Sequence, residues 1–128
     1  MDQILVRASG ALSRYQEIDL GGRVGSADPH ALVTLLYDEL LASLDVMGRS
    51  LANGGVVHHG QHGRAVALLA ALESGLDLRA GTLASSLAQI YRQMQRRLTA
   101  ARNGDAKAVA EISEGVRNLA EAWKSIRA

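Results

Sequence analysis

Two short links centred on glycine divide the second half of this sequence into segments with helical patterning. The links, Ala80-Gly81-Thr82 and Asn103-Gly104-Asp105, each follow one apolar run and precede the next. Glycine favours the left-handed conformation that ends a helix, and Thr82 and Asp105 are suited to cap the helix that follows. Links this short leave consecutive helices antiparallel and side by side. The spacing therefore predicts an all-α, antiparallel bundle.

A third signal, Ser26-Ala27-Asp28-Pro29, predicts the start of the first long helix, with Asp28 as its cap and Pro29 in its first turn. Residues 53–63 hold four glycines and three histidines, which favours a mobile loop between the first and second helices. We therefore predict one four-helix domain over residues 26–128. Residues 1–25 form a short helical or extended segment before it, a candidate mobile cap.

The predicted helices differ in how far apolar residues spread around them. The second, third and fourth helices each carry one seam at spacings of three and four. These seams are Ala65, Leu68, Leu69, Leu72 and Leu76; Leu83, Leu87, Ile90, Tyr91, Met94 and Leu98; and Val109, Ile112, Val116, Leu119, Trp123 and Ile126. On the first helix the apolar arc covers more than half of the circumference. Such an arc predicts a groove for another chain, lined by Val33, Tyr37 and Leu41, unless the N-terminal segment covers it.

Charge and composition exclude several classes of partner. The chain of 128 residues has 14 Lys and Arg against 13 Asp and Glu, a net charge of +1, so nothing in it favours nucleic acid or anionic lipid. It has no cysteine, and no apolar run is long enough for a signal peptide or membrane span. We therefore expect a cytosolic protein with no nucleic-acid partner and no membrane insertion.

The histidines do not form a convincing metal site. His58, His59 and His62 fall in the predicted glycine-rich loop, which lacks the fixed geometry that metal ligands need. His30 falls in the first turn of a helix, where a cation is slightly unfavourable, and we expect it to be exposed. The sequence contains no glycine-rich phosphate loop and no nucleophile on a strained turn. No metal, cofactor or catalytic residue is predicted.

One enzymatic alternative stays open because small all-helical mutases of the chorismate mutase type place Arg and Glu in a helical core. It requires the Arg and Glu side chains of the third and fourth helices to point inward. The predicted seams are almost free of charge, and we expect the cluster Arg92, Arg96, Arg97 and Arg102 to be solvated.

Three stretches resemble the flagellin-specific secretion chaperones of the FliS family. They are Tyr15-Gln16, residues 26–32 leading into Leu36-Tyr37-Asp38, and residues 87–91 running to Arg96-Arg97-Leu98. The link Asn103-Gly104-Asp105 and the terminal Ala122-Trp123-Lys124 extend the resemblance over nearly the whole chain from Tyr15 onward. The chain departs from the family pattern at Tyr91-Arg92-Gln93, where Tyr-Asp-Tyr is frequent.

The resemblance implies a non-enzymatic four-helix bundle in the cytosol. Such a protein binds the disordered C-terminal segment of flagellin, prevents premature polymerisation and escorts flagellin to the flagellar type III export apparatus. Contacts with export-gate components and other flagellar regulators stay open, as does a chaperone or adaptor role for another export client. The predicted partner-binding residues are Leu12, Tyr15, Val33, Tyr37, Leu41, Leu44, Ile90, Tyr91 and Met94.

Overall fold

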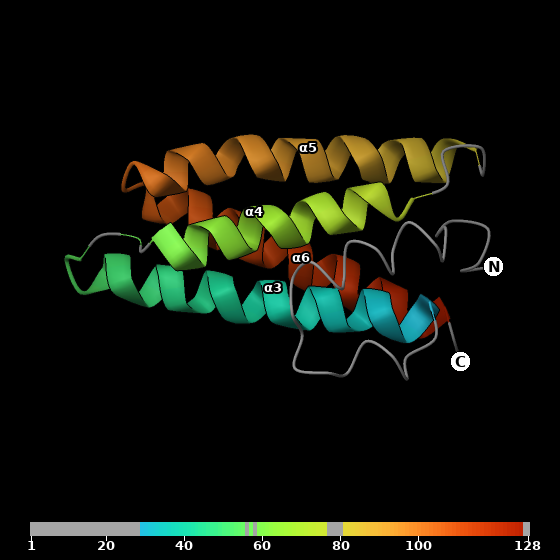
Figure 1. Cartoon of the computed structure of the whole chain (residues 1–128), viewed down its shortest axis with the longest axis horizontal. Coiled ribbons are helices and arrows are strands. Elements are labelled where there is room, and N and C mark those ends of the chain that lie inside the picture. Colours follow the sequence, from blue (N-terminus) through green and yellow to red (C-terminus); the bar gives the residue numbers. More distant parts are fainter. Residues whose placement is uncertain (1–28, 56, 58, 77–80, 127–128) are drawn as a thin grey trace.

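The computed structural model describes residues 29–55, 57, 59–76 and 81–126, and the helix numbers follow Figure 1. The helices are α3 (Pro29–Ala52), α4 (His59–Ser74), α5 (Thr82–Arg102) and α6 (Ala106–Ile126). Both α3 and α5 pack against α4 and α6, and successive helices run in opposite directions (Figure 1). This arrangement confirms the predicted antiparallel four-helix bundle. The predicted segment 1–25 and the predicted cap Asp28 lie outside the described residues.

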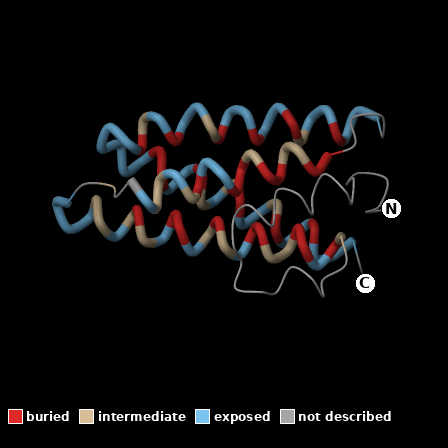
Figure 2. The backbone as a smooth tube through the Cα atoms, in the orientation of Figure 1, coloured by how far each residue is buried: buried red, intermediate tan, exposed pale blue. Residues whose placement is uncertain are grey.

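Buried residues recur along each helix and alternate with exposed ones, as expected for helices with one face toward the core (Figure 2). The core is rich in leucine, as the seams predict. All members of the predicted seam of the second helix are buried, although Leu76 lies just beyond the end of α4. The largest fully buried side chains are Tyr91, Leu32, Leu36, Leu40, Leu44, Met47, Leu68, Leu69, Leu98, Ile112 and Val116. No helix in the described part of the chain has the length and apolarity needed to cross a bilayer.

The two glycine links behave differently at the helices that follow them. Gly104 has a φ of 102°, and Asp105 Oδ1 accepts hydrogen bonds from the backbone N–H groups of Lys107 at 3.0 Å and Ala108 at 3.2 Å. The predicted cap at Asp105 is therefore confirmed. Gly81 has a φ of 108° and itself occupies the cap position of α5, with no side-chain hydrogen bond there. The predicted cap at Thr82 is wrong, since Thr82 is already the first helical residue.

The link between α3 and α4 is shorter than predicted, because α4 begins at His59 within the predicted loop 53–63. Glycine in a helix costs about 1 kcal/mol relative to alanine, so local propensity opposes this start. Contacts with the neighbouring helices offset it: His62 Nε2 bonds with the Leu98 carbonyl at 3.0 Å, and Arg64 pairs with Glu39 at 3.1 Å. Tertiary contacts thus extend a helix into a segment that the sequence alone favours as a loop.

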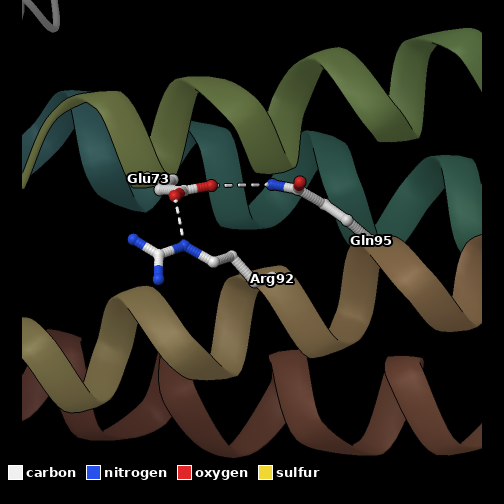
Figure 3. Close-up of polar contacts among 3 residues, drawn as sticks. All are labelled: Glu73, Arg92 and Gln95. Atoms are coloured by element: carbon white, nitrogen blue, oxygen red, sulfur yellow. Dashed lines mark hydrogen bonds and ion pairs between the residues drawn. The ribbon is translucent and has the colours of Figure 1, made fainter.

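A polar contact on the surface joins the far part of α4 to α5. Glu73 accepts hydrogen bonds from Arg92 Nε at 2.8 Å and from Gln95 Nε2 at 3.2 Å (Figure 3). One carboxylate thus bonds with two residues a turn apart on α5 and links these antiparallel neighbours. Arg92 is half exposed. It therefore lies outside the core, as the solvated cluster predicts.

Candidate functional site

The core face of α5 is shifted by one residue from the predicted seam in its first two turns. Ala84 and Ala88 are buried there, whereas the side chain of Leu83 is 57% exposed and that of Leu87 is half-buried. Further along, the predicted Tyr91, Met94 and Leu98 are buried. The prediction that Leu83 and Ile90 belong to the core is therefore wrong. Small alanines facing inward turn the leucines of the first two turns toward the flank of α5 that borders α6.

These flank residues line an apolar pocket between α3, α5 and α6, which we call the α5–α6 groove. Its volume is about 140 Å³, and carbon atoms form almost all of its surface. A cavity of about 150 Å³ accommodates a benzene ring, so the groove has room for one large apolar side chain. Leu83 and Ile126 border it and are largely open to solvent. The lining residues are Tyr37, Leu83, Leu87, Leu119, Ala122, Trp123 and Ile126.

Tyr37 lines the groove with its ring, and its hydroxyl is bonded within the bundle. The hydroxyl oxygens of Tyr37 and Tyr91 are 2.5 Å apart and join the diagonally opposed helices α3 and α5. Burial raises the pKa of Tyr37 to about 12, and the hydrogen bond to Tyr91 partly opposes this shift. Tyr37 is therefore neutral at physiological pH. An uncharged aromatic residue therefore lines the groove.

Trp123 lines the same groove and is held by His30 at the start of α3. The two rings are stacked, with centroids 4.8 Å apart and an angle of 11° between their planes. His30 Nε2 lies 2.8 Å from the Trp123 carbonyl oxygen, and Trp123 Nε1 donates to the His30 carbonyl at 3.0 Å. The prediction of an exposed His30 is wrong. The antiparallel packing brings the end of α6 beside it, where the buried indole N–H needs an acceptor.

A second pocket, the α3–α6 groove, lies toward the other end of the bundle. It is larger, at about 280 Å³, and short side chains form much of its wall. The exposed pair Asp45 and Arg49, 2.6 Å apart, borders it. A charged rim and few large apolar side chains make it a weaker apolar site than the α5–α6 groove. Its lining residues are Leu44, Asp45, Gly48, Arg49, Ala52, Ala106, Val109, Ala110 and Ser113.

The predicted partner-binding residues lie in different parts of the structure. Tyr37 lines the α5–α6 groove and Leu44 the α3–α6 groove, although both are buried. Ile90, 36% exposed, shares a helical stripe with Leu83 and Leu87. Leu41 is half-buried against the core. Val33, Tyr91 and Met94 are core residues. Leu12 and Tyr15 lie outside the described residues.

The exposed apolar surface lies on different helices from the one predicted. Among the described residues, the large hydrophobic side chains exposed by more than a third are Val66, Leu83, Ile90 and Ile126, and none of them is on α3. Five groove residues were not predicted as such, because their spacing favours core seams; these are Leu83, Leu87, Leu119, Trp123 and Ile126. The alanines at 84, 88 and 101 recur at helical spacing as well, and this was the available signal for the true inward face.

The described residues show no arrangement suited to catalysis or metal binding. They contain no group of three or more His, Asp or Glu side chains placed to hold an ion. His62 is bonded to a backbone carbonyl, whereas His58 and the side chain of His59 are not described. Arg97 is exposed and paired with Glu111 on the surface. The inward-pointing Arg and Glu that the mutase alternative requires are absent from this part of the chain.

Comparison with known proteins identifies the family. The model of the flagellar protein FliS family matches residues 11–128. The chain belongs to the FliS family. It is 35% identical over 123 residues to the flagellar secretion chaperone FliS of Salmonella typhimurium, covering 93% of this chain and 90% of that protein. It is 32% identical over 126 residues to FliS of Escherichia coli, covering 91% and 89%, and 28% identical over 122 residues to FliSB of Pseudomonas aeruginosa, covering 93% and 97%.

These matches confirm the family resemblance found in the sequence. FliS proteins are secretion chaperones, a non-enzymatic family, which confirms that the chain is not an enzyme and excludes the mutase alternative.

Proposed function

We propose that the chain binds the disordered C-terminal segment of flagellin in the cytosol, prevents its premature polymerisation and escorts it to the flagellar type III export apparatus. Its membership of a family of flagellar secretion chaperones supports this function. The observation that carries the proposal is the α5–α6 groove, an apolar pocket bordered by the exposed Leu83 and Ile126. Apolar surface of this kind, left open on a small domain, is typical of an interaction site.

The groove accounts for how a flexible client becomes bound. An amphipathic segment of the client places a large aliphatic side chain against Tyr37 and Trp123 while its neighbours cover Leu83 and Ile126. Folding a disordered segment on binding costs about 2 to 5 kcal/mol, so one pocket alone gives little affinity. The client must extend over more of the bundle. Leu12 and Tyr15, whose contact role the resemblance implies, and Leu41 and Ile90 are proposed as parts of that wider surface.

Titration of a flagellin C-terminal peptide into groove variants tests the proposal. Leu83→Glu and Ile126→Glu put a carboxylate where the client's apolar side chains dock, so we expect the affinity to fall about tenfold or more. Val66→Glu is the matched control, since Val66 is an exposed aliphatic residue of α4, which does not line the groove. Its affinity is expected to stay within about twofold of the starting chain.

Two outcomes contradict the proposal. Unchanged affinity in both groove variants would remove the α5–α6 groove as the docking site. A starting chain that does not bind the flagellin peptide, but binds the C-terminal segment of another flagellar export substrate, would favour the alternative client.

A further inference from the structure

We propose that His30 is a positioning residue for client binding, which acts by fixing Trp123 in the wall of the α5–α6 groove. The inference rests on the proposed function, since it assigns a role at the same groove. His30 does not line the groove itself, whereas Trp123 does. The start of α3 and the end of α6, which carry these two residues, lie together at one end of the bundle (Figure 1).

His30 constrains Trp123 through both its side chain and its backbone. The imidazole stacks on the indole, and the His30 carbonyl accepts the indole N–H at 3.0 Å. The imidazole Nε2 lies 2.8 Å from the Trp123 carbonyl oxygen, and with an N–H there it donates to that oxygen. Ring stacking alone would allow the indole to slide in its own plane. The hydrogen bond that Nε1 donates is directional and prevents this movement. Together the contacts fix the position and the tilt of the ring.

The bond to the Trp123 carbonyl also fixes the end of the helix. The helix ends at Ile126, so the Trp123 carbonyl lies in its last turn, and helix ends fray. A histidine side chain is one of the groups that satisfy such carbonyls. His30 thus provides from α3 a cap for the last turn of α6. That turn contributes Trp123 and Ile126 to the groove.

An ion pair that also links α3 to α6 is weaker. Lys124 Nζ lies 3.6 Å from Asp38 Oδ1, and both side chains are about half exposed. Solvent screens an ion pair of that exposure, and many such pairs contribute little. His30 is only 7% exposed, so its bonds to Trp123 are shielded from competing water. The buried contact rather than the ion pair therefore determines where this wall of the groove stands.

Three variants and two measurements test this role. His30→Ala removes the stacking and the donor, and His30→Phe keeps an aromatic ring but removes the donor. His62→Ala is the matched control, because His62 also bonds with a helix carbonyl, that of Leu98, but neither His62 nor Leu98 lines the groove. Each variant is titrated with the flagellin C-terminal peptide at a temperature at which it is fully folded. Trp123, the single tryptophan of the chain, reports the groove wall through its emission maximum and acrylamide quenching.

We expect His30→Ala to weaken peptide binding about tenfold, His30→Phe to fall between it and the starting chain, and His62→Ala to stay within about twofold. Trp123 emission should shift to longer wavelength and become easier to quench in the His30 variants alone. If His30 only stabilised the fold, its variants would behave like His62→Ala. The unfolding midpoint would fall, but the peptide affinity and the Trp123 emission of the folded protein would not change.

Each contrary result is decisive. If both His30 variants bind the peptide within twofold of the starting chain while Leu83→Glu weakens binding, the role of His30 is overturned and the proposed function stands. If His62→Ala weakens binding as much as His30→Ala, the effect is general and the role is likewise overturned. A starting chain that binds no peptide overturns the proposed function and, with it, this inference.

Discussion

The two ends of the bundle differ in how their helices are terminated. At the turn end, where α5 meets α6, Asp105 caps α6, and Gly104 N–H bonds with the Ala101 carbonyl at 3.0 Å. At the groove end, where α5 begins and α6 ends, α5 has no side-chain cap, and Leu83 and Ile126 are exposed. Polar groups satisfy the backbone at the turn end. At the groove end apolar side chains meet the solvent.

The difference indicates that the two ends serve different purposes. Satisfied caps stabilise a fold. Exposed large hydrophobic residues add little to stability, and they favour association. The buried contact between His30 and Trp123 is the exception at the groove end, where it stabilises the wall of the groove. Stability and binding are therefore expected to respond to substitutions at opposite ends of the same helices.

The largest expected contrast comes from two leucines of α5. Leu98, toward the turn end, is fully buried, and Leu83, at the groove end, is 57% exposed. Leu98→Ala leaves a cavity and should lower the free energy of unfolding by about 3 kcal/mol. Leu83→Ala should lower it by less than about 0.5 kcal/mol, because solvent already covers most of that side chain. Urea denaturation of both variants measures these losses.

Peptide binding should reverse this order. Leu83→Ala removes groove surface and weakens binding of the flagellin peptide, whereas folded Leu98→Ala binds it normally. Equal losses of stability in the two variants would mean that Leu83 is packed in solution, and the contrast between the two ends would then be lost.

The same helix shows where sequence patterns suffice and where they do not. The links at Gly81 and Gly104 and the leucine seam of α4 are local or strongly periodic signals, and the structure follows them. The inward face of α5 was ambiguous because the leucines at 83 and 87 and the alanines at 84 and 88 have the same period. The distance between α5 and its neighbours decides between these faces. Sequence periodicity carries no information on that distance.

His30 illustrates a second limit. Its environment depends on Trp123, 93 residues away, so its burial follows from the packing of α3 on α6 rather than from its own neighbours in the sequence. A polar residue in the first turn of a helix is expected to be exposed, so the local sequence predicted His30 at the surface. The same long-range packing forms the α5–α6 groove from three helices, which explains why only Tyr37 among its residues was predicted.

Alkaline titration should give the second largest effect, and it tests whether the floor of the groove is shielded from water. Burial raises the pKa of Tyr37 from 10.0 to about 12. Because the folded-state pKa lies above the unfolded one, the neutral tyrosine stabilises the fold fully below pH 10. The free energy of unfolding therefore falls as the pH rises from about 10 to about 12. The total loss is at most about 2 to 3 kcal/mol. Denaturant unfolding at each pH measures it.

Tyr37→Phe provides the control because it keeps the ring and removes the ionisable group. It also removes the hydrogen bond to Tyr91, which should lower stability by about 1 kcal/mol at neutral pH. Above pH 10 its stability should fall less steeply than that of the starting chain. If the free energy of unfolding fell equally with pH in the two proteins, water would reach the Tyr37 hydroxyl. The groove end would then be looser than its geometry indicates.

The smallest expected effect compares the first turns of α5 and α6 directly. Asp105→Ala removes the acceptor for the Lys107 and Ala108 N–H groups and should lower the free energy of unfolding by about 1 kcal/mol. Thr82 follows Gly81 as Asp105 follows Gly104, but Gly81 occupies the cap position of α5. Thr82→Ala therefore removes no capping hydrogen bond. It should change stability by less than about 0.5 kcal/mol. Thermal unfolding of the two variants measures the difference, and an equal loss would show that Thr82 caps α5 in solution. The start of α5 would then be terminated by a polar side chain like the start of α6, and the exposure of Leu83 would remain as the feature that distinguishes the groove end.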